Sequence, residues 1–375
     1  SMKIKRLLVV PCDTLVQGKE VARRTSFFGE AASFLAIKLG RSGFSYDGEI
    51  QFYGDFPALL GKEHVFVYGR FHPHLYVKHV PKNCPYPSCH GLPKGTAIGS
   101  KDLSAVMSQV DAVFVSLRGG ERAQEVLAEA GRRGIPRALF DFEDYPEIYG
   151  RALAAKELTA GYAHGKDFEL YFKKELPLGF RTDTILPLAP SPVRPESYRF
   201  PNANKRHAIF YSGRSRPGCQ ADREEAVALL GKFPGGEFID HDRRRRSFLT
   251  THEYWRHLAE SRMALSPSGK SWDSYRHCEV GLAPQTLLIA PKPFIETAGP
   301  QLIDGRNAIL YDTEFRDGKY HLKDAGALAD AVRYYLSHDD ERKKIADAWQ
   351  RDVLSGHTVL GRSCYILESM ERAFS

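Results

Sequence analysis

The sequence predicts an α/β protein with two Rossmann-like domains that face each other across a cleft. Three observations support this fold class. Short apolar segments typical of buried parallel strands alternate with segments of helical period in both halves of the chain. A Pro-rich segment separates the halves, and 375 residues suffice for two cores. We therefore expect a first domain over residues 1–186, a linker over 187–204 and a second domain over 205–350.

Composition indicates a globular protein without a membrane anchor. The chain is 42% hydrophobic and 26% charged, and no apolar run approaches the roughly 20 residues that span a bilayer. No signal segment precedes the first apolar run, and Ser1-Met2 is typical of a tag remnant. Six scattered cysteines indicate reduced thiols. We therefore expect a cytoplasmic protein.

The positive charge of the chain is concentrated in one run. The net charge is +7, and Arg243–Arg246 form its densest part. Such a run is usually a solvated loop, and the alternative is a peripheral contact with DNA or an anionic lipid surface. Cys84, Cys89 and His90 lack a second Cys/His pair at zinc-site spacing, and Asp240-His241-Asp242 is typical of an exposed turn. We therefore predict no metal site.

The first half begins with a strand over residues 3–10, whose following loop carries Asp13. In an open α/β sheet, the loop after a strand faces the crevice, so Asp13 is a catalytic candidate, although a turn role is equally compatible. Residues 49–54 and 63–70 are expected to form strands, and His72 follows the second one. His72 could act as a base or bind an acceptor, and the alternative is a surface histidine.

A βαβ unit follows in the first half. Strand 111–117 and helix 121–133 precede a second strand that ends in three acids, Asp141, Glu143 and Asp144. A carboxylate at this edge of the sheet could deprotonate an acceptor hydroxyl. Asp141 and Glu143 are therefore catalytic candidates. The alternative is that these acids cap a helix or hold a basic neighbour.

The second half opens with the strand 207–213 and then Arg214-Ser215-Arg216-Pro217-Gly218. A strand, a glycine, basic residues and a helix that begins near Asp222 form a layout suited to an anion. Gly213, Arg214 and Arg216 are therefore candidates for binding an anion.

The segment from Tyr254 to Asp312 contains the most informative pattern. A strand over 262–265 is followed by the polar loop 266–271 and a helix, for which Ser271 or Asp273 is the expected N-cap. The free N–H groups at such a helix start suit a phosphate. Arg276 and Glu279 share a helix face, so the guanidinium could bind phosphate and the carboxylate could accept from ribose hydroxyls. The alternative is an exposed i,i+3 ion pair.

The stretch SYRHCEVGLAPQTLLIAPKPFIETAGPQLIDGRNAILYD resembles the carboxyl-terminal half of GT-B glycosyltransferases. The pattern S-x-R-x-x-E, here Ser274, Arg276 and Glu279, is similar to the exostosin-like and CgeB-like (group 1) branch. The retaining branch has an acid eight positions before the glutamate, where this chain has Ser271, and that difference favours inversion. The resemblance also implies that the C-terminal helix, residues 351–375, packs back toward the first domain.

The resemblance implies a glycosyltransferase that moves a sugar from a nucleotide diphosphate sugar to a hydroxyl, with acceptor binding in the first domain. UDP- or GDP-sugars are the expected donors, and the acceptor could be a glycan, lipid, protein or DNA. No metal or cofactor beyond the co-substrate is expected. The alternatives are a DNA-modifying transferase, an inactive nucleotide-binding protein and, less favoured, a nucleotide-sugar epimerase. The donor-binding candidates are Gly213, Arg214, Arg216, Ser266, Ser268, Gly269, Ser271, Ser274, Arg276 and Glu279.

Overall fold

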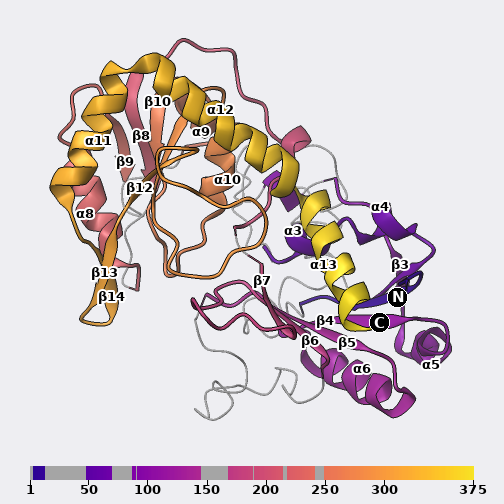
Figure 1. Ribbon diagram of the computed structural model, residues 1–375. Coiled ribbons are helices and arrows are strands. Elements are labelled where there is room, and N and C mark those ends of the chain that lie inside the picture. Colours follow the sequence, from indigo (N-terminus) through magenta and orange to yellow (C-terminus); the bar gives the residue numbers. More distant parts are fainter. Residues whose placement is uncertain are drawn as a thin grey trace. The chain divides into compact units, whose positions relative to one another are not determined.

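The computed structural model describes residues 3–12, 48–69, 87–89, 91–144, 168–188, 190–213, 218–240 and 249–375. The chain forms two compact units. Unit 1 comprises residues 1–188 and 359–375, and unit 2 comprises residues 189–358. Each unit contains a parallel sheet with helices packed on it (Figure 1). The prediction of two Rossmann-like parts is therefore confirmed.

The described strands of unit 1 form a seven-stranded parallel sheet in the order β3-β2-β1-β4-β5-β6-β7. Its central strands are short and almost completely buried, as the apolar runs predicted. The strand bounds are β1 Leu7–Val10, β2 Val65–Tyr68, β3 Thr96–Ile98, β4 Ala112–Ser116, β5 Arg137–Asp141, β6 Leu170–Lys173 and β7 Ile185–Pro187.

Both faces of this sheet are covered. Leu7 and Val9 of β1 point into one apolar cluster, and Leu8 and Val10 point into the other, because side chains alternate along a strand. Helices α5 and α6 pack on the second face, whereas α3 and α13 pack on the first (Figure 1). The described helices of unit 1 are α3 Ile50–Tyr53, α4 Phe56–Leu60, α5 Leu103–Met107, α6 Gly120–Arg133 and α13 Val359–Ala373, with 3-10 turns η3 Pro87–Cys89 and η4 Ser100–Asp102.

The strand predicted over residues 49–54 is wrong, because this segment forms the short helix α3. The adjacent residues Phe52 and Tyr53 both pack into the same cluster, which an alternating strand would not allow. The carboxylate of Glu49 fixes the helix start, since it accepts hydrogen bonds from the Tyr53 hydroxyl, the Cys12 amide and the Ser116 hydroxyl. Tertiary packing therefore overrides the strand preference of the aromatic residues.

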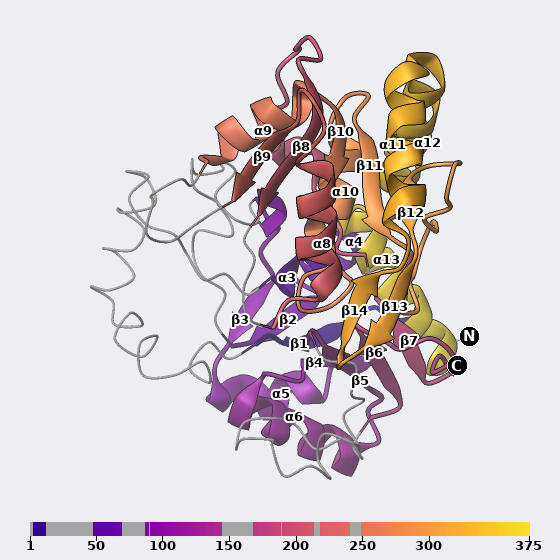
Figure 2. The same cartoon turned by 90° about the vertical axis from the view of Figure 1, so that its left-hand side faces the viewer.

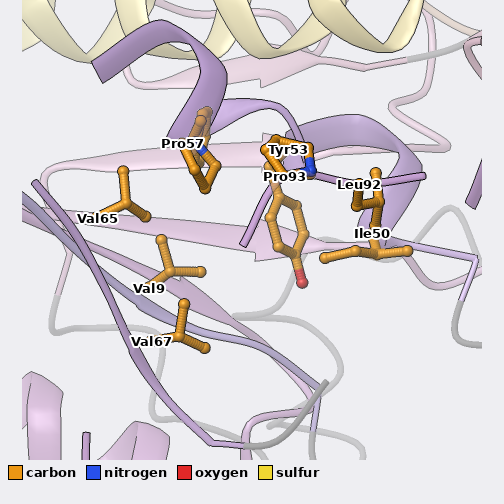
Figure 3. A pocket seen from close by; sticks show the side chains of 10 residues that line it. Val9, Ile50, Tyr53, Pro57, Val65, Val67, Leu92 and Pro93 are labelled. Atoms are coloured by element: carbon orange, nitrogen blue, oxygen red, sulfur yellow. The ribbon is translucent and has the colours of Figure 1, made fainter. Parts of the chain in front are cut away.

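Figure 3 shows an apolar pocket of unit 1 beside β1 and β2. Its lining residues are Val9, Ile50, Tyr53, Gly54, Phe56, Pro57, Val65, Val67, Leu92 and Pro93. A lining without charged side chains does not suit a nucleotide diphosphate, which needs cationic or N–H donors. The predicted donor-binding residues, from Gly213 to Glu279, all belong to unit 2 instead.

The described strands of unit 2 form a five-stranded parallel sheet in the order β12-β11-β10-β8-β9. Register pairs such as Met263 with Leu287 and Ala264 with Phe210 hold its centre together. The strand bounds are β8 His207–Gly213, β9 Glu237–Asp240, β10 Ser261–Leu265, β11 Leu287–Pro291 and β12 Ile309–Tyr311. An antiparallel hairpin, β13 Thr313–Arg316 with β14 Lys319–Leu322, follows β12 (Figure 2).

Helices cover both faces of the unit 2 sheet. Ala226 and Leu230 of α8, and Leu328 and Val332 of α11, share one apolar cluster with the strands. On the other face, Phe210 of β8 contacts the rings of α9. The described helices of unit 2 are α8 Ala221–Leu230, α9 Thr251–Ala259, α10 Tyr275–Leu282, α11 Ala325–Ser337 and α12 Asp339–Gly356, with the 3-10 turn η5 Pro195–Ser197. In the described part of the chain, no helix combines the length and apolarity that a bilayer span requires.

The Pro-rich segment that was expected to be a linker belongs largely to unit 2. The carboxylate of Asp273 accepts hydrogen bonds from the Ser191 amide, at 2.8 Å, and the Ser191 hydroxyl. Val193 forms a bridge with Thr358, and Tyr198 is buried. The unit boundary therefore lies at residues 188 and 189, near the start of the predicted linker.

The end of the chain belongs to unit 1. Ile366 and Met370 of α13 are buried in the cluster that contains α3, and the Tyr365 hydroxyl donates to the Pro187 carbonyl at 3.0 Å. The segment that returns to unit 1 begins at Val359 rather than at residue 351, because α12 continues to Gly356 within unit 2.

A close helix contact in unit 2 leads to a stability prediction. A Cβ atom at Gly281 of α10 would lie 2.6 Å from Val353 and 2.9 Å from Trp349 of α12. Gly281→Ala should therefore lower the free energy of unfolding by about 1–3 kcal/mol, despite the better helix propensity of alanine. Urea denaturation measures the change. Gly269→Ala is the matched control, because its nearest neighbours would be 3.8 Å away, and equal losses in both variants would contradict the packing argument.

Candidate functional site

The connections of the unit 2 sheet reverse direction between β8 and β10. From β8 the chain continues to β9 on one side, and from β10 it continues to β11 and β12 on the other. In open α/β sheets, ligands bind in the crevice that this reversal leaves at the carboxyl ends of the strands. Gly213 ends β8 and Ser266 follows β10, so the two predicted donor-binding loops begin at this position.

Arg276 lies in the first turn of α10, among three tyrosines. Its Cζ atom is 6.0 Å from the ring centroid of Tyr211 and 5.9 Å from that of Tyr275, and Tyr254 also lies close to it. Among the described residues, no carboxylate oxygen lies within 4.0 Å of its guanidinium nitrogens, and its buried Nε has no hydrogen-bond partner. Arg276 is partly exposed. The guanidinium is therefore a fixed positive charge that can receive an anion.

Glu279 is buried behind Arg276. Its side chain is 2% exposed, and its carboxylate accepts hydrogen bonds from Tyr198, at 3.0 Å, and Tyr254, at 3.3 Å. Burial raises the pKa of Glu279 to about 7, although Arg276 and the two tyrosines oppose this shift. Burial also raises the pKa of Tyr254, so its hydroxyl stays protonated and can donate. An exposed Arg276–Glu279 pair, the alternative reading of the sequence, is therefore wrong.

The loop after β10 is fixed by buried polar contacts. Ser268 donates its N–H to Asp222 at 3.2 Å, and its carbonyl accepts from Nε of Arg223 at 2.7 Å. Arg223 also donates to the Tyr211 hydroxyl at 3.1 Å, and the Tyr211 ring lies beside Arg276. Arg223 and Tyr211 therefore connect the loop of residues 266–271, called the Ser268 loop below, with Arg276. The buried Ser266 hydroxyl has no partner within the described residues. Such a hydroxyl retains its full capacity to donate to an oxygen.

The rest of the loop is held by backbone contacts. Gly269 donates its N–H to the Ser271 carbonyl at 2.8 Å, and the Gly269 carbonyl accepts from the Gln220 amide at 2.8 Å. At the end of β8, a Cβ atom on Gly213 would lie 2.4 Å from the Tyr211 hydroxyl. Glycine at position 213 therefore leaves room for the tyrosine that lies beside Arg276.

The N-cap of α10 differs from the prediction. Ser274 is the N-cap, and its hydroxyl accepts from the Arg276 amide at 3.4 Å. Ser271 and Asp273 were expected in this role. Asp273 instead holds Ser191, and Ser271 is engaged through its carbonyl, so the helix begins later. Helix α10 therefore starts at Tyr275, directly before Arg276.

His277 lies buried beside this arrangement. Burial lowers its pKa to about 4, and the positive charges of Arg276 and Arg223 act in the same direction. Nε2 lies 3.1 Å from the carbonyl oxygen of Trp272, an arrangement that suits a neutral ring donating from Nε2. The influence of both arginines on one ring indicates that two cationic side chains lie near each other at this sheet edge.

The acids at the end of β5 in unit 1 each hold a basic neighbour. Asp141 is 2% exposed, lies 3.1 Å from Nζ of the buried Lys173 and accepts from the Tyr171 hydroxyl. Glu143 pairs with Arg118 at 2.9 Å. Asp144 likewise pairs with a lysine, Lys174, at 2.8 Å. These contacts support the structural alternative, and the catalytic role of Asp141 and Glu143 stays a prediction.

Several candidates lie outside the described residues. Asp13 and His72, the other catalytic candidates, are among them, as are Arg214 and Arg216. The same holds for the basic run Arg243–Arg246 and for Cys84 and His90. Their predicted roles stay predictions.

The sequence did not identify four residues that shape this site, namely Tyr198, Tyr211, Arg223 and Tyr254. Arg223 follows the predicted start of α8 near Asp222, so an arginine in the first turn of that helix was the available signal. The tyrosines carry no local signal, because their contacts join residues such as Tyr198 and Glu279, which are 81 positions apart.

Comparison with known families adds to this geometry. Residues 216–368 match a family model described as glycosyl transferase-like. That region of the chain is glycosyltransferase-like. It includes the Ser268 loop, Arg276 and Glu279, so the matched residues are those that build the site. The chain has no match among curated proteins.

Solved structures resemble the whole fold at low identity. A glycosyltransferase from Rickettsia africae is 12% identical with a TM-score of 0.50, over 99% of this chain and 98% of that one. HepE from Anabaena in complex with UDP-glucose is 10% identical with a TM-score of 0.47, over 98% and 99%. Sucrose-phosphate synthase from Thermosynechococcus elongatus is 11% identical with a TM-score of 0.47, over 97% and 98%. The first likeness supports the two-sheet α/β fold.

Proposed function

We propose that this chain is a glycosyltransferase that moves a sugar from a nucleotide diphosphate sugar to a hydroxyl acceptor. The observation that carries the proposal is the Arg276 guanidinium, which lies at the crevice of a glycosyltransferase-like region without an ionic partner among the described residues. A partly buried protein cation commonly has a counter-charge. A diphosphate supplies that counter-charge and matches the planar fork of arginine.

The surrounding groups suit the leaving nucleoside diphosphate. As the bond to the sugar breaks, negative charge grows on the diphosphate oxygens, and preorganised donors lower the energy of that state. The Arg276 guanidinium and the Ser266 hydroxyl are such donors, and the positive end of the α10 dipole adds to their effect. We propose that these protein groups stabilise the negative charge on the diphosphate without a catalytic metal ion.

We propose that the Glu279 carboxylate binds the ribose of the donor. An ionised carboxylate has about four acceptor positions, and Tyr198 and Tyr254 use two of them. The remaining positions can accept from sugar hydroxyls once the side chain moves from its buried position. The Ser274-x-Arg276-x-x-Glu279 pattern is also our reason to propose the exostosin-like and CgeB-like branch, and the serine at position 271 is our reason to propose inversion.

A thermal-shift panel tests the donor assignment. The full chain is heated with uridine, guanosine, adenosine and thymidine diphosphate sugars at millimolar concentration. We expect the nucleotide sugar with one of these bases to raise the Tm of the protein by several degrees. A ligand at about 100 times its Kd stabilises the folded state by about 2.7 kcal/mol. Slow hydrolysis of the same donor without an acceptor is the second expected result.

Different outcomes separate the alternatives. If no nucleotide raises Tm, the site assignment is wrong. If a donor binds but neither hydrolysis nor transfer to any hydroxyl acceptor is detected, the inactive nucleotide-binding protein is the correct alternative. For a productive acceptor, the anomeric configuration of the product, measured by NMR, decides between inversion and retention.

A further inference from the structure

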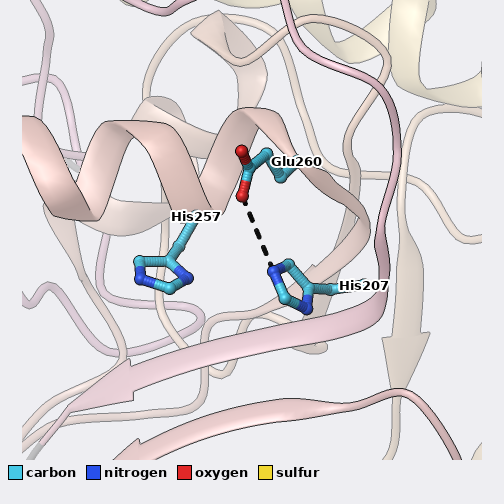
Figure 4. Close-up of side chains that lie close together, drawn as sticks. All are labelled: His207, His257 and Glu260. Atoms are coloured by element: carbon cyan, nitrogen blue, oxygen red, sulfur yellow. Dashed lines mark ion pairs between the residues drawn. The ribbon is translucent and has the colours of Figure 1, made fainter.

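Three side chains with metal-ligating atoms meet at the opposite edge of the unit 2 sheet (Figure 4). His207 is the first residue of β8, His257 lies in the last turn of α9, and Glu260 is the C-cap of that helix. The fold fixes their proximity, because β8 pairs with β10 and places His207 beside Ser261, the neighbour of Glu260. The Glu260 carbonyl also accepts from the His207 amide at 3.1 Å.

The shortest printed distance in this cluster is close to that between two ligands of a tetrahedral metal ion. One ligand atom from each residue lies within 4.8 Å of the other two, and Nε2 of His207 is 3.7 Å from Oε2 of Glu260. Tetrahedral zinc with bonds of 2.0–2.1 Å separates its ligand atoms by about 3.3 Å. All three residues are partly buried, so small side-chain rotations can complete the geometry. Figure 4 shows both rings and the carboxylate turned toward one another.

Two further observations suit a ligand here. Nδ1 of His257 is buried and has no hydrogen-bond partner among the described residues. Buried polar atoms are normally paired, and a metal ion would satisfy this nitrogen. In addition, Oε2 of Glu237 lies 4.0 Å from Nδ1 of His207. Histidine ligands commonly give their second N–H to such a carboxylate, which fixes the ring orientation.

We infer that His207, His257 and Glu260 bind one divalent transition metal ion of the zinc class, with water as the fourth ligand. Two imidazoles and one carboxylate are a ligand set that favours zinc over magnesium or calcium. Arg206 competes for Glu260 at 3.9 Å, but its side chain is 70% exposed, so this pair is weak.

The site has a structural role. The cluster lies at the beginning of β8, about 20 Å from the end that faces the donor crevice, as the rise along seven residues implies. The ion would join β8 to the end of α9. Helix α9 also carries Tyr254, one turn before His257, and Tyr254 contacts Glu279 and Arg276. The metal therefore stabilises the helix that supports the donor site without entering the transfer reaction.

Metal binding to the full chain tests this inference. The protein is stripped with a chelator and titrated with Zn2+ by calorimetry and with Co2+ by visible absorption. We expect one equivalent to bind, a tetrahedral cobalt spectrum and a higher Tm with zinc. His207→Ala and His257→Ala should each weaken binding at least 100-fold, and Glu260→Gln should weaken it to a smaller extent. His252→Ala, an exposed histidine on the same helix, is the matched control and should bind as the wild type does.

The Tm values of the metal-free variants must match that of the metal-free wild type, which separates loss of a ligand from loss of folding. If a histidine variant does not match the Tm of the metal-free wild type, the cobalt spectrum of Glu260→Gln is used instead. A spectrum that differs from that of the wild type supports the site, and an unchanged spectrum contradicts it. The inference is overturned if zinc binding survives both histidine variants. It is equally overturned by a thiolate-to-cobalt absorption band, which would assign the metal to cysteines. Nucleotide binding is measured separately, so failure here leaves the proposed function unaffected.

Discussion

Replacing Arg276 with alanine should lower the affinity for the bound nucleotide diphosphate sugar about 100-fold and lower its hydrolysis at least as much. The guanidinium has no carboxylate partner within ion-pair distance among the described residues, so its charge is available to the diphosphate. Charge-assisted hydrogen bonds to a partly buried arginine strengthen as negative charge accumulates on the leaving group. Calorimetry and single-turnover hydrolysis measure the two effects.

Two variants make the Arg276 experiment specific. Arg276→Lys should recover part of the affinity, because an ammonium keeps the charge but loses the planar fork. Arg256→Ala, an exposed arginine on α9, should bind and hydrolyse the donor as the wild type does. The Arg276→Ala protein should also show a higher pKa for Glu279, since Arg276 holds that pKa down. Unchanged donor binding in Arg276→Ala would remove the basis of the proposed site.

The contribution of Glu279 to the stability of the wild type should decrease between about pH 4 and pH 8. Its pKa is about 7 in the folded protein and 4.5 in the reference state, so the folded protein binds the proton more tightly. Folded-state stability from this group is therefore complete at low pH and is lost as the pH rises through the folded pKa. Relative to the wild type, Glu279→Gln should gain roughly 3 kcal/mol in free energy of unfolding over this range.

Urea denaturation at closely spaced pH values measures this difference. A difference in free energy of unfolding that is the same at every pH results from the changed contacts with Tyr198 and Tyr254. A difference that changes with pH results from the protonation of Glu279. Glu224→Gln, which alters an exposed carboxylate of α8, should follow the wild-type profile. If the free energies of unfolding of Glu279→Gln and wild type change in parallel with pH, Glu279 is ionised throughout, and other interactions compensate for the burial of its charge.

The sequence predicts the parallel strands well, because a buried strand needs a continuous apolar run and such runs stand out between loops. It fails at residues 49–54, where helix α3 forms because adjacent aromatic side chains enter one cluster. It also missed the hairpin β13–β14, although Asp317-Gly318 between alternating residues was a usable signal. Both residues have positive φ, 52° and 77°, as such a turn requires.

The site is predictable only where its residues are close in sequence. Arg276 and Glu279 lie on one short helix, so their spacing indicates a shared position. The tyrosines that bond Glu279 come from residues 198 and 254, and no local pattern connects them with it. The three acids at the end of β5 illustrate the same limit, because their strand-end position suggests catalysis, whereas basic partners such as Lys173 lie elsewhere in the chain and give no local signal.

Unit 1 is assembled from two stretches that are separated by the whole of unit 2. During synthesis, residues 1–188 leave the ribosome first, but the surface that α13 covers stays open until residues 359–375 emerge. Unit 2 is one continuous stretch of the chain, so it can fold while the surface for α13 is still uncovered. The order of translation therefore favours completion of the later unit before the earlier one, and it leaves the apolar face of α3 as the surface that chaperones would need to shield.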